Sequence, residues 1–170
     1  MSITVIDYGS GNLRSAAKAL EIAAHNVKLD SKIIVTSDPK KVKESKKIIL
    51  PGQGSFRDCY LGIKKIAGLE EALNESVLVH KRPIFGICVG MQLFAKIGYE
   101  SQETKGFGWI DASVRKINNI NNAARFFLLM DANKRVYKFY FTCMVPHYFS
   151  IFKLRSCIRL RCFIKNYTCY

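Results

Sequence analysis

The sequence predicts an α/β fold in which a mostly parallel sheet carries helices on both faces. Through the first 117 residues, short β-branched apolar runs alternate with segments whose apolar residues recur at helical spacing. Glycine-rich turns follow two of the predicted strands. Alternating strands and helices are typical of a parallel sheet, since each helix returns the chain to the edge where the strand began. The length of 170 residues suffices for one core.

The N-terminal part contains two predicted strand–helix units. "SITVIDY" (2–8) is a β-branched run that ends in the turn "GSGN" (9–12). Apolar residues then step by four, three and four residues along one helix face, at Leu13, Ala17, Leu20 and Ala24. "KIIVTSD" (32–38) predicts a second strand, and Asp38-Pro39 opens a short helix because proline suits a first helical turn.

Further elements follow in the same alternation. "KKIILPGQGSF" (46–56) predicts a third strand that ends in a glycine-rich turn. Residues 58–80 are predicted to be helical, with an interruption at Gly68. "FGWIDASVRKI" (107–117) alternates in the manner of a strand.

The most informative segment joins a predicted strand over 82–87 to a predicted helix over 90–99. Cys88 lies at this junction, between Gly86 and Gly90. A nucleophile flanked by two glycines at a strand-to-helix turn is the nucleophile elbow, in which a strained backbone projects the side chain from the sheet edge. The pattern predicts that Cys88 is a catalytic nucleophile.

Neighbouring residues have the chemistry that such a nucleophile needs. The predicted helix directs its N-terminus at the sulfur and is expected to lower the pKa of Cys88. The backbone N–H of Val89 and those of the turn at Gly52, Gln53 and Gly54 are candidate donors to an oxyanion. Gln92 follows one helical turn later, where its amide suits a polar substrate.

The spacing Gly86-x-Cys88-x-Gly90-x-Gln92, after a Pro51-Gly52-x-Gly54 turn, resembles the class I glutamine amidotransferase domain. The opening "VIDYGSGNLRS" (5–15) resembles one branch, the glutaminase subunit of imidazole glycerol phosphate synthase. The resemblance covers residues 1–117 and implies a flavodoxin-like sheet that is incomplete at the C-terminus.

This resemblance also implies an activity. Cys88 would attack the side-chain amide of glutamine, and the ammonia released would pass to a cyclase subunit for histidine biosynthesis. Asn12, in the first turn, would lie near the interface of that heterodimer. The resemblance implies no metal and no organic cofactor.

The family also uses a histidine as general base and a glutamate that orients it, from a His-Pro-Glu segment. No His-Pro-Glu occurs here. His25 and His80 precede the elbow and are expected to be solvent-facing, and His147 in "VPHYFS" is no recognisable match. Because triad members act as a unit, we expect an impaired enzyme.

Residues 118–170 have a different composition from residues 1–117. They contain nine basic residues and one acidic residue, no glycine, and twelve of the twenty aromatic residues. Such a segment lacks the residues that make turns. We expect a divergent tail outside the amidotransferase domain, and a shifted reading frame or a truncation would explain it.

Other function classes have weaker signals. The net charge of +14 and the aromatic residues of 134–167 favour, as an alternative, a non-catalytic binder of single-stranded nucleic acid. Gly9-x-Gly11 and Gly52-x-Gly54 are half-matches to a dinucleotide-binding motif. Cys157, Cys162 and Cys169 lack paired zinc-ligand spacing. Membrane attachment of the tail would rest on composition alone. The N-terminus lacks the basic region of a signal peptide, so we expect a cytoplasmic protein.

Overall fold

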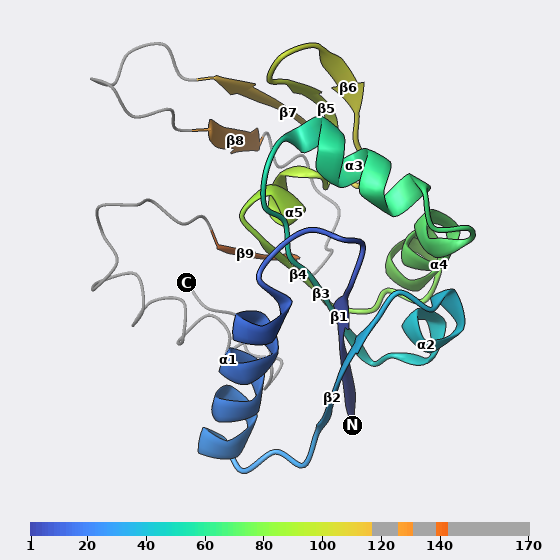
Figure 1. Cartoon of the computed structure of the whole chain (residues 1–170), viewed down its shortest axis with the longest axis vertical. Coiled ribbons are helices and arrows are strands. Elements are labelled where there is room, and N and C mark those ends of the chain that lie inside the picture. Colours follow the sequence, from blue (N-terminus) through green and yellow to red (C-terminus); the bar gives the residue numbers. More distant parts are fainter. Residues whose placement is uncertain (117–125, 131–138, 143–170) are drawn as a thin grey trace.

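The computed structural model describes residues 1–116, 126–130 and 139–142 (Figure 1). Its main sheet has five strands in the order β2-β1-β3-β4-β9, and every neighbouring pair is parallel. This confirms the predicted α/β class. The strands of this sheet are β1 (Ser2–Ile6), β2 (Lys32–Thr36), β3 (Lys47–Leu50), β4 (Ile84–Ile87) and β9 (Phe139–Thr142).

Helices cover both faces of the main sheet. In Figure 1, α1 stands to the left of the strands, whereas α2 and α4 lie to their right. Asn12 caps α1, and a left-handed glycine at position 68 separates α3 from α4 as the sequence predicts. The helical elements are α1 (Leu13–Asn26), α2 (Pro39–Glu44), α3 (Phe56–Lys64), α4 (Leu69–Asn74), the π-helical turn η1 (Glu75–Val79) and α5 (Val89–Gln92).

Strand β3 lies at the centre of the core. All four of its residues are buried, because helices cover both sides. Ile48 and Leu50 face the cluster formed with α2, α3 and α4, and Ile49 faces Leu20 and other residues beneath α1. A strand buried on both faces requires a continuous apolar run, which "IIL" supplies.

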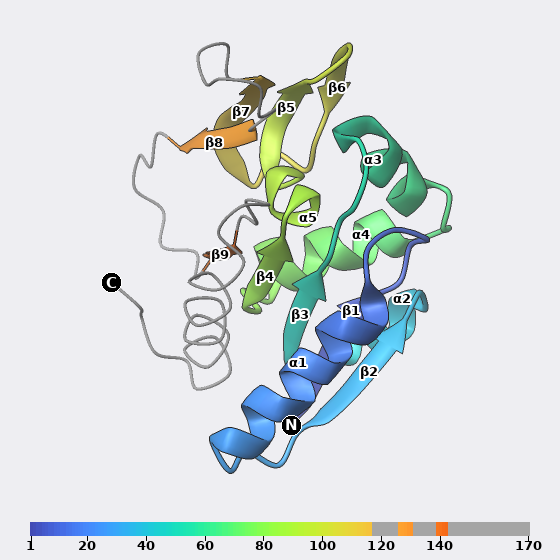
Figure 2. The ribbon, with the colours of Figure 1, turned by 60° about the vertical axis from the view of Figure 1, so that its left-hand side comes forward.

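A second sheet lies at the end of the first, beyond α5 (Figure 2). Its order is β6-β5-β7-β8, with β5 and β7 parallel and the other pairs antiparallel. The strands of this sheet are β5 (Ala95–Tyr99), β6 (Glu103–Lys105), β7 (Ile110–Lys116) and β8 (Phe126–Met130).

Strand β5 corrects the helix predicted over 90–99, of which only α5 is observed. The carbonyl groups of residues 93–96 accept hydrogen bonds from the N–H groups of residues 106, 107, 108 and 110. Those acceptors are therefore not available to a continuing helix. The ring of Phe56 also lies where a Cβ on Gly98 would be, so this backbone packs directly on α3. Tertiary pairing thus overrides the local helical pattern.

Within the described residues, no helix has both the length and the apolar character needed to cross a bilayer.

Because β3 is buried on both faces, we expect alanine substitutions of a buried and an exposed isoleucine to lower the free energy of unfolding by different amounts. Replacing Ile49 with alanine removes a fully buried side chain and is expected to lower the free energy of unfolding by about 2–5 kcal/mol. The matched change Ile22→Ala, on a side chain that is 52% exposed in α1, is expected to cost less than about 1 kcal/mol. Urea unfolding of both variants measures the difference. Equal losses would contradict the assignment of the core.

Candidate active site

Cys88 occupies a strained position between β4 and α5. Its backbone has φ 54° and ψ −121°, and it is one of three non-glycine residues with positive φ in the described chain. Such a conformation costs about 1–3 kcal/mol and persists only where the surroundings impose it. The side chain is partly buried at the edge where the parallel strands end. The structure therefore confirms the predicted elbow geometry.

The surroundings that impose this conformation are backbone contacts between two turns. A Cβ added to Gly90 would overlap the carbonyl oxygen of Leu50, and one added to Gly52 would overlap the amide nitrogen of Gly90. Likewise, a Cβ on Gly86 would overlap the backbone of Met91. Glycine is required at each of these positions for space, as the elbow pattern predicts.

The electrostatics of Cys88 differ from the sequence-based prediction. Burial disfavours the thiolate and raises the pKa of Cys88, and the adjacent backbone N–H of Val89, which acts to lower this pKa, does not offset burial. A nearby second thiol, that of Cys59, acts in the same direction. The expected lowering by the helix is wrong because α5 has only four residues and burial disfavours the charged form.

The predicted oxyanion donors have different environments. Gly52 is buried against Val89 and Gly90, beside the elbow. The N–H of Gln53 donates to the hydroxyl of Ser10 at 3.0 Å, so it is engaged in this structure. Gly54 is exposed, with a φ of 106°. On this turn the arrangement favours Gly52 as the donor that would act together with Val89.

Two other predicted residues lie close in sequence to these turns. Gln92 ends α5 and is buried, and its backbone N–H donates to the Cys88 carbonyl at 3.3 Å. Asn12 is exposed, and its Oδ1 accepts from the N–H of Ser15 at 3.1 Å as the cap of α1. The roles predicted for them in substrate and partner binding stay predictions.

Sequence reasoning missed a group of residues behind the glycine turn. The Tyr8 hydroxyl donates to the Pro51 carbonyl at 2.5 Å, and the Ser10 hydroxyl donates to the Gln53 carbonyl at 2.6 Å. The Cys59 thiol, from α3, lies 3.4 Å from the Ser10 oxygen. Tyr8 and Ser10 stand within the quoted opening motif, which was a usable signal, whereas nothing in the sequence indicates Cys59.

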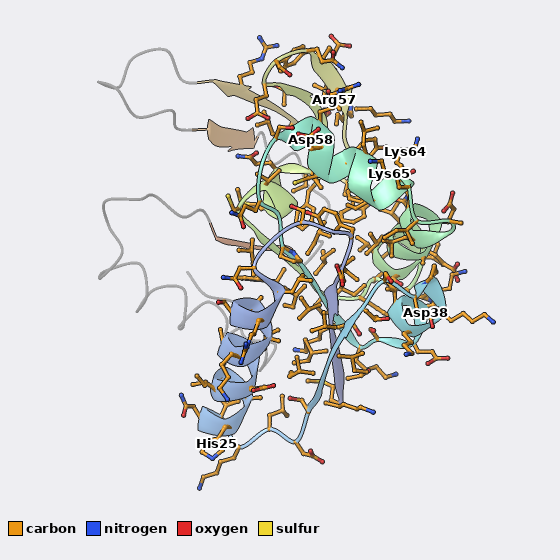
Figure 3. All side chains as sticks on the ribbon, in the orientation of Figure 1. His25, Asp38, Arg57, Asp58, Lys64 and Lys65 are labelled. Carbon is orange, nitrogen blue, oxygen red and sulfur yellow. The ribbon has the colours of Figure 1, made fainter. Side chains whose placement is uncertain are left out.

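Both histidines in the described part of the chain lie away from Cys88. Helix α1 runs back from the site edge for 14 residues, about 21 Å, and carries His25 to its far end (Figure 3). His80 lies 3.3 Å from a Glu75 oxygen, but this pair precedes β4, whereas Cys88 follows it. The four residues of that strand span about 13 Å. This His–Glu pair is therefore at the wrong edge for a triad.

Several predictions concern residues beyond the described ranges. His147 and the cysteines Cys157, Cys162 and Cys169 lie outside them, as does most of the basic aromatic segment 134–167. Among the described residues, no group of three or more histidine, cysteine, aspartate or glutamate side chains is placed to hold a metal ion.

The raised pKa of Cys88 predicts the pH dependence of its alkylation. The thiolate is the reactive form, so the rate with iodoacetamide should rise through a midpoint above that of an ordinary cysteine. Peptide mass spectrometry against pH, with free cysteine as the reference, measures this midpoint. A midpoint below the reference would contradict the dominance of burial.

Contact between the turns predicts the effect of adding one methyl group. Gly90→Ala is expected to lower the free energy of unfolding by more than about 3 kcal/mol, because neither backbone can give way. Gly9→Ala is the matched control, since Gly9 has a φ of 82° but nothing within 4 Å of the added Cβ. Its expected cost is only the conformational one, about 1–2 kcal/mol. Equal costs in denaturant unfolding would refute the contact.

Comparisons with known proteins agree with this geometry. The chain is 48% identical over 123 residues to the imidazole glycerol phosphate synthase subunit HisH of Pelagibacter ubique, covering 72% of this chain and 57% of that protein. It is 52% identical over 117 residues to the subunit HisH of Bradyrhizobium diazoefficiens, covering 69% and 54%. The chain thus spans about half the length of the curated relatives it matches.

The likeness extends to a solved structure and to a family. A crystal structure of a glutamine amidotransferase superimposes with a TM-score of 0.53 at 20% identity, covering 66% of this chain and 56% of that chain, which concerns the fold alone. The sequence model of glutamine amidotransferase class-I matches residues 4–137, well over half of the chain. Together with an assembled Cys88 elbow, this match shows that the chain belongs to the class I glutamine amidotransferase family.

Proposed function

We propose that this chain carries the nucleophile of a glutaminase that supplies ammonia for imidazole glycerol phosphate synthesis. The observation that carries the proposal is the strained backbone of Cys88 at the junction of β4 and α5, where Gly52 and Gly90 pack against each other. The two relatives named above, subunits of imidazole glycerol phosphate synthase, support the choice of pathway.

The proposed reaction is an acyl transfer to sulfur. The Cys88 thiolate attacks the γ-amide carbon of glutamine, a C–S bond forms, and the carbonyl oxygen becomes an oxyanion held by Val89 and Gly52. Collapse of this intermediate breaks the C–N bond, and the nitrogen takes up a proton and leaves as ammonia. Water then cleaves the thioester, which releases glutamate and restores the thiol.

The proton transfers are the step at which we expect impairment. A general base must take the thiol proton, and an acid must protonate the leaving nitrogen. In the described ranges, neither His25 nor His80 reaches Cys88 from its edge of the sheet. The raised pKa of the thiol increases the need for a base. We therefore propose slow turnover, with the catalytic domain over 1–117 and a divergent tail over 118–170.

A cyclase subunit is the proposed acceptor of the ammonia, and the two would form a heterodimer. Asn12 is exposed in the turn after β1, at the edge of the sheet where Cys88 also lies. That edge is where ligands bind in open parallel sheets, so a partner docked there would receive ammonia directly. The proposed location is the cytoplasm, where cysteines stay reduced. Among the described residues, Cys59 and Cys88 are free thiols.

Ammonia release from glutamine tests the proposal. With a cyclase subunit present, we expect a Cys88-dependent rate at least about a thousandfold below that of a complete HisH-type enzyme, since the base and its orienting group act as a unit with the nucleophile. Cys88→Ala should abolish this residual rate. A rate that persists in Cys88→Ala would contradict the proposed nucleophile.

Histidine variants serve as matched controls for the same assay. His25→Ala and His80→Ala should change the Cys88-dependent rate less than twofold, because both side chains lie at the opposite edge. An ordinary turnover number that is lost in His147→Ala would contradict the proposed impairment and assign the base to His147.

A further inference from the structure

The glycine turn at 51–54 is held from behind by groups that the proposed reaction does not use. Three side chains contact it: those of Tyr8 and Ser10, in the turn after β1, and that of Cys59, in α3. None of them is a triad member. Each of the three side chains hydrogen-bonds a backbone atom of the turn.

From these contacts we infer that Tyr8 is a positioning residue: its buried hydroxyl fixes the Pro51–Gly52 turn, and with it the Gly52 amide, against the Cys88 elbow. This inference rests on the proposed glutaminase function, since it assigns the turn to oxyanion binding. It concerns the placement of a donor, not contact with substrate.

The bond that carries the inference is the one between Tyr8 and Pro51. The hydroxyl donates to the Pro51 carbonyl at 2.5 Å, and the Tyr8 side chain is only 5% exposed. Proline has no N–H, so its carbonyl is the only backbone hydrogen-bonding group at position 51. Removing the hydroxyl would leave that carbonyl unpaired in a buried setting, which costs more than the bond itself contributes.

Pro51 is in close contact with the elbow, so a displacement of Pro51 would also displace the elbow. A Cβ on Gly11 would lie 2.9 Å from the Pro51 Cβ, and one on Gly90 would lie 2.9 Å from the Pro51 carbonyl carbon. Pro51 is therefore held between the first turn of the chain and the residue two places after the nucleophile. The next residue, Gly52, is in backbone contact with Val89 and Gly90. Any shift of Pro51 would displace both proposed oxyanion donors relative to each other.

The Tyr8 ring is itself fixed by α3. A Cβ on Gly62 would lie 2.9 Å from the Tyr8 carbonyl oxygen and 3.1 Å from Cδ2 of the ring. This close approach leaves the ring no room on that side. Burial, and then the neighbouring Cys59, raise the pKa of Tyr8 above that of an ordinary phenol. The hydroxyl thus remains a donor throughout the range in which a thiol titrates.

Ser10 and Cys59 are weaker candidates for the same role. Two Ser10 bonds reach the backbone of Gln53, which is exposed, so water can replace them, and its third contact is with the Cys59 thiol at 3.4 Å. The Cys59 thiol is 1% exposed, but its contact with the Gln53 carbonyl is 3.5 Å, and a thiol is a weak donor. Tyr8 alone combines burial with a strong donor.

Tyr8→Phe tests the inference, with Tyr60→Phe as the matched control. The Tyr60 hydroxyl also donates to a partner, the Glu70 carboxylate at 2.7 Å, but this bond joins α3 to α4 and not to the glycine turn. Each full-length variant is given two reagents. L-γ-Glutamyl-p-nitroanilide acylates Cys88 through an oxyanion, and its good leaving group lessens the need for a general acid. Iodoacetamide alkylates the same sulfur without any oxyanion.

We expect Tyr8→Phe to lower the maximal acylation rate about tenfold, because a displaced oxyanion donor loses part of its effect. Its KM and its iodoacetamide rate should stay within twofold of the parent chain, and Tyr60→Phe should change none of these. An acylation rate equal to that of Tyr60→Phe would overturn the inference. So would an equal fall with both reagents, because that result indicates general loosening of the site.

Hydrogen exchange of the 51–54 amides separates failure of the inference from failure of the proposed function. We expect exchange of Gly52 to rise at least about tenfold in Tyr8→Phe and to stay unchanged in Tyr60→Phe. If the parent chain is not acylated at all, the proposed function fails. Hydrogen exchange alone then tests whether Tyr8 fixes the position of the Gly52 amide. Unchanged exchange in Tyr8→Phe would overturn the inference.

Discussion

The site depends on one contact, the meeting of two glycine turns backbone to backbone. Gly52, after β3, and Gly90, after Cys88, approach so closely that a single added methyl group on either would overlap main-chain atoms. Cys88 lies beside this contact in a strained backbone conformation, and the amides of Gly52 and Val89 lie at the same edge of the sheet. The catalytic geometry is therefore a property of how adjacent parallel strands end, not of the cysteine alone.

The rest of the fold supports that contact from both faces. β3 supplies the first turn and is buried on both sides, and β4 supplies the second and pairs with β3 in parallel register. Behind the first turn, α3 packs on Tyr8 through Gly62, and Tyr8 in turn bonds Pro51. A tightly packed interior transmits small displacements. Changes several residues from Cys88 are thus expected to reach its oxyanion donors.

Much of this arrangement could be predicted from the sequence because it is locally encoded. Short apolar runs indicated β1, β2, β3 and β4, apolar residues at helical spacing indicated α1, and the spacing around Cys88 indicated the elbow. The predictions that were wrong concern features that depend on residues distant in the sequence. Residues 95–99 form β5, because residues 106–110 take the carbonyls that a helix would need. Burial reversed the expected direction of the Cys88 pKa shift, and burial depends on the assembled core.

The contacts behind the turn were not predictable for the same reason. Tyr8 and Pro51 are 43 residues apart, and Ser10 and Cys59 are 49 apart. No periodicity links residues at such separations. The sequence was thus informative about local turns and uninformative about the long-range contacts that support them.

The most direct test of the central claim is covalent labelling with a chloroketone analogue of glutamine, followed by peptide mapping of all six cysteines. The reagent tests whether the assembled elbow recognises glutamine as well as exposing a thiol, and it does not require a complete triad. The account predicts one label per chain, on Cys88, with protection by free glutamine. Labelling spread over several cysteines, or labelling of Cys88 that glutamine does not slow, would contradict it.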